Sequence, residues 1–168
     1  MKKIILFSFL VAGFAISSFG QVTATATASA TIVSPIAITK TVDMNFGNVA
    51  VSTTAGTVVL APAGTRTSTG GVTLPATTGT VAAAAFTVTG QAGYTYAITL
   101  PSTDYTITRA TGTETMIVNT FTSNPSATGT LTGGTSALTV GATLNVGGSQ
   151  VAGSYTNATG FPVTVNYN

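Results

Sequence analysis

Hydrophobic and polar positions alternate along this chain with a period of two, and the longest such run is residues 21–33. One face of an extended segment there would carry Val22, Ala24, Ala26, Ala28, Ala30 and Ile32, and the other face Thr23, Thr25, Thr27, Ser29 and Thr31. Successive side chains of a β-strand point to opposite faces, so the run predicts a strand. Twelve strand residues span roughly 40 Å, about twice the length of a usual strand. A strand this long need not lie wholly within its own domain.

Shorter runs of the same period follow, and Gly, Pro, Asn and Ser residues separate them. These predicted strands are residues 36–39, 42–51, 57–60, 71–74, 83–90, 94–100, 105–108, 114–121, 137–146 and 161–167. The three residues 91–93 predict a tight hairpin between two of the strands, and Gly112 predicts a second hairpin turn. The composition of residues 61–71 predicts a hairpin loop. Gly47 and Gly141 interrupt strand patterns and predict bulges or close backbone approaches.

About ten short strands with turn signals between them, and no window of helical periodicity, predict an all-β chain. The abundant Thr and Val residues are β-branched and favour pleated surfaces. No repeat of fixed period and no linker divides the chain, so we expect one antiparallel β-sandwich domain of Ig-like or Greek-key layout over residues 21–168. Tyr155, just before the last strand, fits a tyrosine corner, in which a phenol bonds to nearby backbone and stabilises the sandwich.

Residues 1–20 differ from the rest of the chain and predict a secretory signal peptide. Lys2 and Lys3 form a positive start, an apolar segment follows, and Ser18 and Gly20 place small residues before a cleavage point at Gln21. Export would bring the mature protein to the periplasm, the cell surface or the medium. No later stretch is apolar over about 18 residues, so we expect no membrane span in the mature chain.

The mature chain has few charges, which removes several classes of function. The whole sequence has five Lys and Arg residues against three Asp and Glu residues. Without Lys2 and Lys3, three basic residues balance three acidic ones, and no basic patch remains for nucleic acid. The sequence has no Cys and no His, so it lacks a disulfide framework, a thiolate metal site and the commonest general base. Low net charge permits close self-association.

The remaining candidates for catalysis are sparse. Lys40 is the only lysine after the signal peptide, and a Ser–Lys dyad would need it as the base. Asp43, Asp104 and Glu114 are widely spread in sequence, and no calcium-loop pattern surrounds them. We therefore expect no enzyme activity, no catalytic residues, no metal and no cofactor.

Aromatic residues leave a sugar-binding or surface-binding face open as an alternative. The candidates for such a face are Tyr94, Tyr96, Phe86, Phe46 and Tyr167. Residues of this kind also fill sandwich cores and form cross-strand pairs, and that interpretation is favoured here.

Three features together carry a resemblance to a group of known proteins. They are the alternating opening run, the Met-Asn-Phe-Gly strand at residues 44–47, and the path from Gly153 and Tyr155 into the Val-rich strand that ends at Tyr167. In these features the chain resembles an uncharacterised bacterial family of secreted Ala/Thr-rich β-sandwich proteins. That family is similar to the spore-coat protein U group and to the major subunits of archaic chaperone–usher pili. The pilus relatives often hold a disulfide near the first strand, whereas this chain has no Cys.

The resemblance implies donor-strand complementation, in which each subunit is an incomplete sandwich and the N-terminal strand of the next subunit fills its groove. The donor residues would be Val22, Ala24, Ala26 and Ala28, and the acceptor edge would carry Val163, Val165 and Tyr167. Ala30, Ile32 and the residues towards Ile36 would stay in the subunit's own first strand. The implied partners are further copies of the chain in a head-to-tail polymer, with a periplasmic chaperone and an outer-membrane usher as candidate helpers.

Two hypotheses for function follow from the sequence. In the first, the protein is a structural subunit of a bacterial surface fibre of the fimbria or pilus kind. In the second, it is a self-contained secreted β-sandwich module that binds a carbohydrate or a surface. Residues 22–28 distinguish the two, because they pair with a neighbouring subunit in the first and within their own domain in the second.

Overall fold

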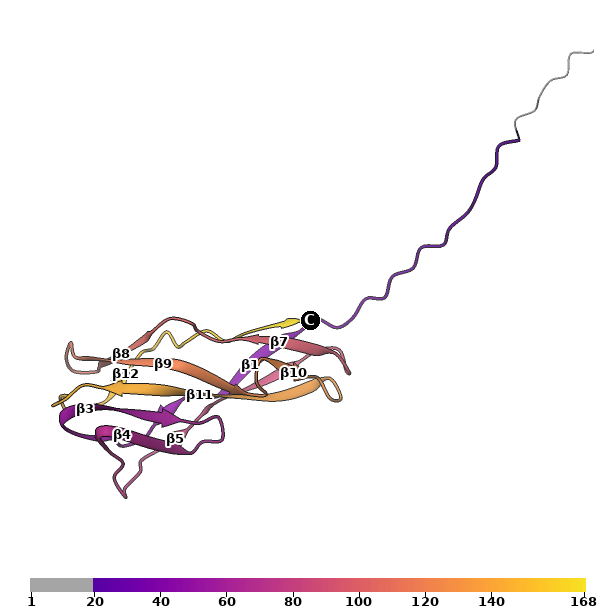
Figure 1. The fold of residues 1–168 in the computed structure, drawn as a ribbon. Coiled ribbons are helices and arrows are strands. Elements are labelled where there is room, and N and C mark those ends of the chain that lie inside the picture. The colour runs from indigo at the N-terminus through magenta and orange to yellow at the C-terminus, as the bar shows by residue number, and fades with distance from the viewer. Residues whose placement is uncertain (1–19) are drawn as a thin grey trace, which may run out of the picture. The chain divides into compact units, whose positions relative to one another are not determined.

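The computed structural model describes residues 20–168 of the chain (Figure 1). Its compact unit is Val33–Asn168, and residues 20–32 belong to a separate unit. The predicted signal peptide, except for Gly20, lies outside the described residues.

All regular structure in the described residues is β-structure, as predicted. The strands are β1 (Ala37–Val42), β2 (Asn45–Phe46), β3 (Ala50–Leu60), β4 (Arg66–Thr73), β5 (Val81–Ala82), β6 (Ala84–Thr89), β7 (Thr95–Thr99), β8 (Tyr105–Arg109), β9 (Thr115–Asn124), β10 (Thr128–Thr130), β11 (Thr135–Val146), β12 (Tyr155–Thr156) and β13 (Thr164–Tyr167). All of their pairings are antiparallel. Within residues 20–168, no helix is long and apolar enough to cross a bilayer.

The long strand β11 organises the main, eight-stranded sheet (Figure 1). Its first half pairs with β6, which in turn pairs with β1, and its second half pairs with β3, which in turn pairs with β4. Along its other edge β11 pairs with β9, and β8 and β12 follow. Gly141 marks the change between the two halves: a Cβ there would run into the backbone around Leu60, and the pairing with β9 shifts register beside it. The predicted bulge or close approach at Gly141 is thus confirmed.

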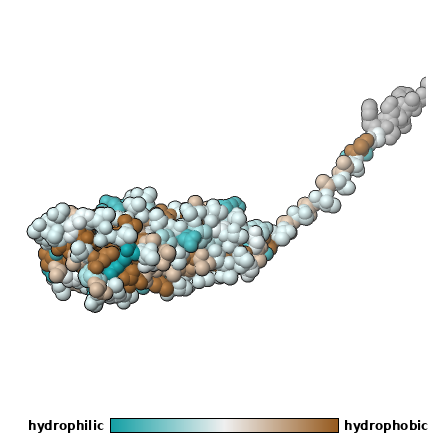
Figure 2. Space-filling model, turned by 60° about the horizontal axis from the view of Figure 1, so that its bottom comes forward, coloured by the Kyte–Doolittle hydropathy of each residue, from teal (hydrophilic) through white to brown (hydrophobic). Residues whose placement is uncertain are grey.

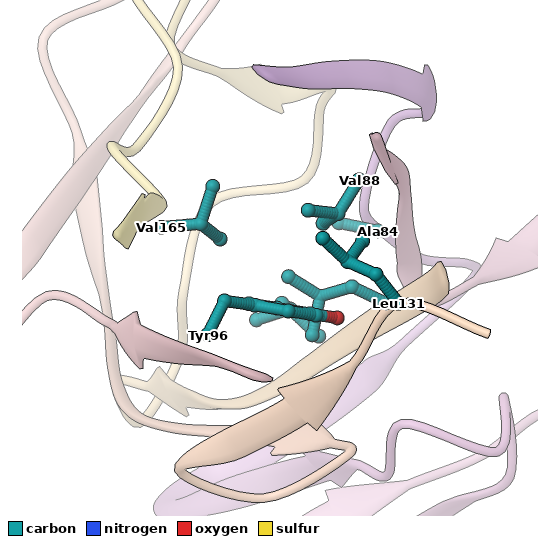
Figure 3. Packing of buried hydrophobic residues seen from close by; sticks show 7 residues of the cluster. Ala84, Val88, Tyr96, Leu131 and Val165 are labelled. Carbon is teal, nitrogen blue, oxygen red and sulfur yellow. The ribbon is translucent and has the colours of Figure 1, made fainter. Parts of the chain in front are cut away.

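A smaller sheet of order β10-β7-β13 packs over only part of the main sheet. The core between the two sheets is lined from both sides, with Ala84 and Val88 from β6 facing Tyr96 from β7 and Val165 from β13 (Figure 3). Leu131 closes this core and is fully buried. The phenol of Tyr96 donates a hydrogen bond of 2.9 Å to Ser136 Oγ, so its polar end is satisfied inside the packed layer.

The other part of the main sheet carries a second apolar cluster. A cross-strand row of Val58, Leu144, Val118 and Tyr105 runs through β3, β11, β9 and β8. The first three residues of the row are buried, and Tyr105 is half-buried. The residues packed against this cluster include Met44, Phe46 and Val49, which come from β2 and its flanking loops. A third sheet, the two-stranded pair β2-β5, belongs to this cover.

One predicted connection was wrong, and a second was correct as a hairpin but too long. Residues 83–90 and 94–100 do not form a hairpin across residues 91–93, because β6 pairs with β1 and β11 while β7 pairs with β10 and β13. Residues 91–93 instead carry the chain from one sheet to the other. The predicted loop at 61–71 is shorter, since β4 already begins at Arg66 and pairs with β3. The predicted hairpin with its turn near Gly112 is confirmed by the pairing of β8 with β9.

The predicted opening strand at residues 21–33 is not part of any sheet in the structure. Residues 20–36 carry no strand, residues 20–32 are all exposed, and the first strand of the domain begins at Ala37. Ala30 and Ile32 therefore do not lie in the domain's own first strand, contrary to the prediction. The physical reason is that alternation specifies a strand only when a partner edge is available, and none of the described strands pairs with this segment.

Candidate functional site

The main candidate site is an open groove of about 1560 Å³ over the second apolar cluster. Its buried lining includes Ala84, Val118, Leu144 and Val146, and its half-buried lining includes Phe86, Ile107 and Met116. One wall is formed within residues 38–51, and the opposite wall within residues 150–163. The groove lies where the smaller sheet ends: β13 starts only at Thr164, and residues 157–163, before it, carry no strand.

Strands β1 and β13 each leave one edge open beside this groove. Within residues 20–168, strand β1 pairs with β6 alone, and strand β13 pairs with β7 alone. Ser34, before β1, meets Tyr167 at the end of β13, while Ile38 and Val163 both line the groove. The two strands therefore run past each other in opposite directions. Unpaired N–H and C=O groups along such edges form a template for an added strand.

Tyr167 fixes the point at which the chain enters the domain. Its phenol donates a hydrogen bond of 2.8 Å to the Ser34 carbonyl and accepts one of 2.6 Å from the Gln91 N–H. The Ser34 N–H donates to Gln91 Oε1 at 3.3 Å, so the backbone of Ser34 is held through both of its polar groups. The ring of Tyr94 packs edge-on against Tyr167, with 5.6 Å between ring centroids.

The groove carries apolar surface with a single charged pair at its margin. Lys40 Nζ lies 2.5 Å from Asp43 Oδ1, and both side chains are more than half exposed. These are the only charged residues among the groove's lining residues, and they neutralise each other. Figure 2 shows the face that is turned towards the viewer, on which brown hydrophobic side chains gather around a small teal, hydrophilic area. A neutral groove of this kind suits an uncharged, partly apolar occupant.

Hydrogen bonds hold the wall within residues 150–163 in place. The Tyr155 phenol donates to the Val151 carbonyl at 2.6 Å and accepts from Gln150 Nε2 at 2.8 Å. This is the backbone contact expected of a tyrosine corner.

Arg109 and Glu114 form a two-pronged ion pair across the β8–β9 turn, with Nε–Oε2 and Nη2–Oε1 distances of 2.7 and 3.2 Å. The guanidinium of Arg109 lowers the pKa of the Glu114 carboxyl below its ordinary value.

The residues predicted from sequence as an acceptor edge fall into different places. Val163 lines the groove, Val165 is buried in the core between the two sheets, and Tyr167 forms the clamp at Ser34. The predicted donor residues Val22, Ala24, Ala26 and Ala28 are exposed in the separate unit 20–32, and 96% of Val22 is exposed. Sequence reasoning missed the groove lining on β8, β9 and β11, although each of these strands showed the period-two signal.

The aromatic candidates for a sugar-binding face are also dispersed. Tyr96 is completely buried, Phe86 and Phe46 line the groove, and Tyr94 packs against Tyr167. The structure therefore does not bring all five together on one surface.

The acidic candidates have separate partners. Asp43 pairs with Lys40, Asp104 accepts a hydrogen bond of 2.9 Å from Asn119, and Glu114 pairs with Arg109. Within residues 20–168, no three of the metal-binding residue types His, Cys, Asp and Glu gather at one place.

Comparison with known proteins gives one match. The family model described as "Domain of unknown function (DUF4402)" matches residues 36–167, which include every strand from β1 to β13. Neither a curated protein nor a solved structure matches the chain at a significant level.

Proposed function

The chain belongs to the DUF4402 family, and from the groove of its domain we propose that it is a structural subunit of a bacterial surface fibre. The N-terminal segment of one copy, residues 21–32, would bind as a strand in the groove of the next. The observation that carries this proposal is the coexistence, in one chain, of three features. They are a neutral groove with buried apolar side chains in its lining, the open edges of β1 and β13, and the alternating residues 21–32, which pair with none of the described strands.

The size of the groove favours an extended polypeptide over a small ligand. Its volume of about 1560 Å³ exceeds the roughly 300–1,000 Å³ usual for small-molecule pockets. An added strand would give main-chain hydrogen bonds to the open edges of β1 and β13 and would cover the row of Val118 and Leu144. Strand addition of this kind draws affinity from the backbone and specificity from alternate side chains.

The N-terminal segment has the properties that such an occupant needs. It has no charged side chain, so it matches the neutral lining of the groove. Its Ala, Val and Ile side chains would turn towards the groove, and its Thr and Ser side chains towards water. Since residues 20–32 are exposed, binding would require no strand to be broken in the donor copy.

Binding between copies would build an open fibre. The donor segment and the acceptor groove are different surfaces of one chain, so the contact is heterologous, and such contacts propagate unless the rotation between copies closes a ring. An exported chain whose three basic and three acidic residues balance after loss of Lys2 and Lys3 is compatible with close lateral contact between copies. A chaperone that covers the groove before assembly, and an usher that guides export, belong to this proposal as partners.

The test uses two neighbouring residues that the proposal places on opposite faces of the donor strand. Ala26→Asp puts a charge on the face that enters the groove, and Thr25→Asp puts the same charge on the face that meets water. Both residues are exposed outside the domain, so neither change should affect its folding. We expect fibres of the full mature chain, seen by electron microscopy, to be lost in Ala26→Asp and kept in Thr25→Asp.

Deletion of residues 22–28 should likewise remove the polymer and leave a folded monomer. A synthetic peptide of residues 21–32, added to that monomer, should bind with protection of the β1 amides from hydrogen exchange. A stable wild-type monomer whose own residues 22–28 are protected from exchange would contradict the proposal. That result would favour the self-contained carbohydrate- or surface-binding module.

A further inference from the structure

We infer that the two ends of the N-terminal segment, Val22 and Ile32, set the register in which it lies in the groove, and that the alanines between them do not. This inference rests on the proposed function and adds to it the residues that select one alignment. It also gives a role to Ile32, which lies outside residues 22–28.

The alanines cannot fix an alignment by themselves. The inward face would carry Ala24, Ala26, Ala28 and Ala30 in succession. A slip of the strand by two residues keeps the same face towards the groove and replaces one alanine with another at three of these four positions. A strand with such a uniform pattern has a weakly specified register and tends to slip.

Val22 and Ile32 break this equivalence because they are the only large apolar side chains in residues 20–32. They are 96% and 97% exposed, so nothing in their own chain uses them in the described structure. Both share the face of the alanines. A slip of two residues in either direction would move both side chains away from whatever apolar contacts they make in the correct alignment.

The distance between the two ends fits the length of the groove. Val22 and Ile32 are ten residues apart, which is about 33 Å in an extended strand. Measured along β11, the groove lining extends from Phe86 of β6, whose register partner is Leu138, to Val146. That stretch of eight residues is about 26 Å long. The alanines would therefore lie over the lining, and Val22 and Ile32 at its two ends.

The junction between the donor segment and the donor's own domain limits the direction in which the segment can slip. Only Val33 separates Ile32 from Ser34, whose backbone is held by Gln91 and Tyr167. Further entry of the segment into the groove would push the donor's own domain against the acceptor. Slip can thus occur only outwards, and each slip of two residues would lengthen the subunit repeat by about 7 Å.

The experiment compares fibres of the full mature chain carrying Ile32→Ala, Ile32→Val or Thr31→Ala, with the rise per subunit measured by cryo-electron microscopy. We expect a single rise in the wild type, in Thr31→Ala and in Ile32→Val, and a second population with a rise longer by about 7 Å in Ile32→Ala. Fibres of Ile32→Ala should also dissociate about tenfold faster or more in denaturant, because an anchoring side chain is lost.

The possible outcomes distinguish a failure of the role of Ile32 from a failure of the proposed function. Fibres of Ile32→Ala with the same single rise and the same dissociation rate as Thr31→Ala would overturn the role of Ile32 and leave the proposed function standing. The same mixture of two rises per subunit in Ile32→Val and in Ile32→Ala would also overturn the role of Ile32. Absence of fibres in the wild type would overturn the proposed function and this inference with it.

Discussion

The clamp at Ser34 makes the sharpest prediction about the domain itself. Tyr167→Phe keeps the ring and removes the phenol oxygen that joins the Ser34 carbonyl to the Gln91 N–H. Each hydrogen bond contributes about 0.5–1.5 kcal/mol net, so the loss of both should lower the free energy of unfolding by about 1–3 kcal/mol. At roughly 4 °C per kcal/mol for a domain of this size, the melting temperature should fall by about 4–12 °C.

The chain supplies a matched control for this substitution. Tyr94→Phe removes a phenol from the neighbouring ring of the same aromatic pair, and no hydrogen bond of that phenol is present within the described residues. Its effect should stay within about 0.5 kcal/mol. Urea unfolding followed by circular dichroism gives both values, and hydrogen exchange at Gln91 should accelerate only in Tyr167→Phe. If the two variants have the same stability, the clamp does not hold the entry of the chain and the reasoning fails.

Three further predictions concern the core, the ion pair and the groove. Leu131→Ala, at a fully buried position, should cost about 2–5 kcal/mol of unfolding free energy, measured by urea titration. The pKa of Glu114 is lowered in the folded state by Arg109, so the pair stabilises the fold above the unfolded pKa and this contribution is lost as the pH falls through the folded pKa. Glu114→Gln should therefore weaken the fall of the melting temperature with pH below about pH 4.5, measured by thermal melts at several pH values. Burial raises the pKa of Tyr105, which lines the groove. In fibres, alkaline absorbance titration against a Tyr105→Phe control should show a further rise of this pKa, because the donor strand would bury the phenol more deeply. An unchanged pKa of Tyr105 in fibres would argue against an occupied groove.

Local sequence signals predicted those parts of the fold that depend on local geometry. The hairpin of β8 and β9 follows from two alternating segments and a short turn that contains Gly112, all within about twenty residues. The all-β character follows in the same way, since the period of two is a property of each strand alone. These predictions needed no knowledge of which strands meet.

Pairing between distant strands could not be predicted from the same signals. The turn at residues 91–93 has hairpin composition, yet β6 finds its partners in β1 and β11. The start of β4 looked like a loop because Arg66 and Gly70 belong to a polar segment, whose backbone nevertheless pairs with β3. Pairing at a sheet edge can use backbone groups without apolar side chains, so polarity alone hides such strands.

The groove shows the same limit more clearly. Val163 was predicted because it lies in a terminal strand pattern. The row of Val118 and Leu144 was not, since their adjacency depends on the register between β9 and β11. The donor segment was visible from sequence because alternation over residues 21–33 is local, but whether it has a partner depends on edges elsewhere in the chain.

The small side chains of the donor imply that the groove itself must provide much of the binding free energy. Ordering eleven donor residues costs about 16 kcal/mol at a mid-range 1.5 kcal/mol each. About ten main-chain hydrogen bonds at 1 kcal/mol each, and four alanine methyl groups at 0.8 kcal/mol each, return about 13 kcal/mol. Val22 and Ile32 at about 1.5–3 kcal/mol each bring the sum to about 16–19 kcal/mol, roughly level with that cost before any loss of translational freedom. The net gain must then come from covering the half-buried Phe86, Ile107 and Met116 of the acceptor. Large side chains in the groove and small ones in the donor are thus two halves of one packing arrangement, in which the acceptor carries the apolar surface that an alanine strand lacks.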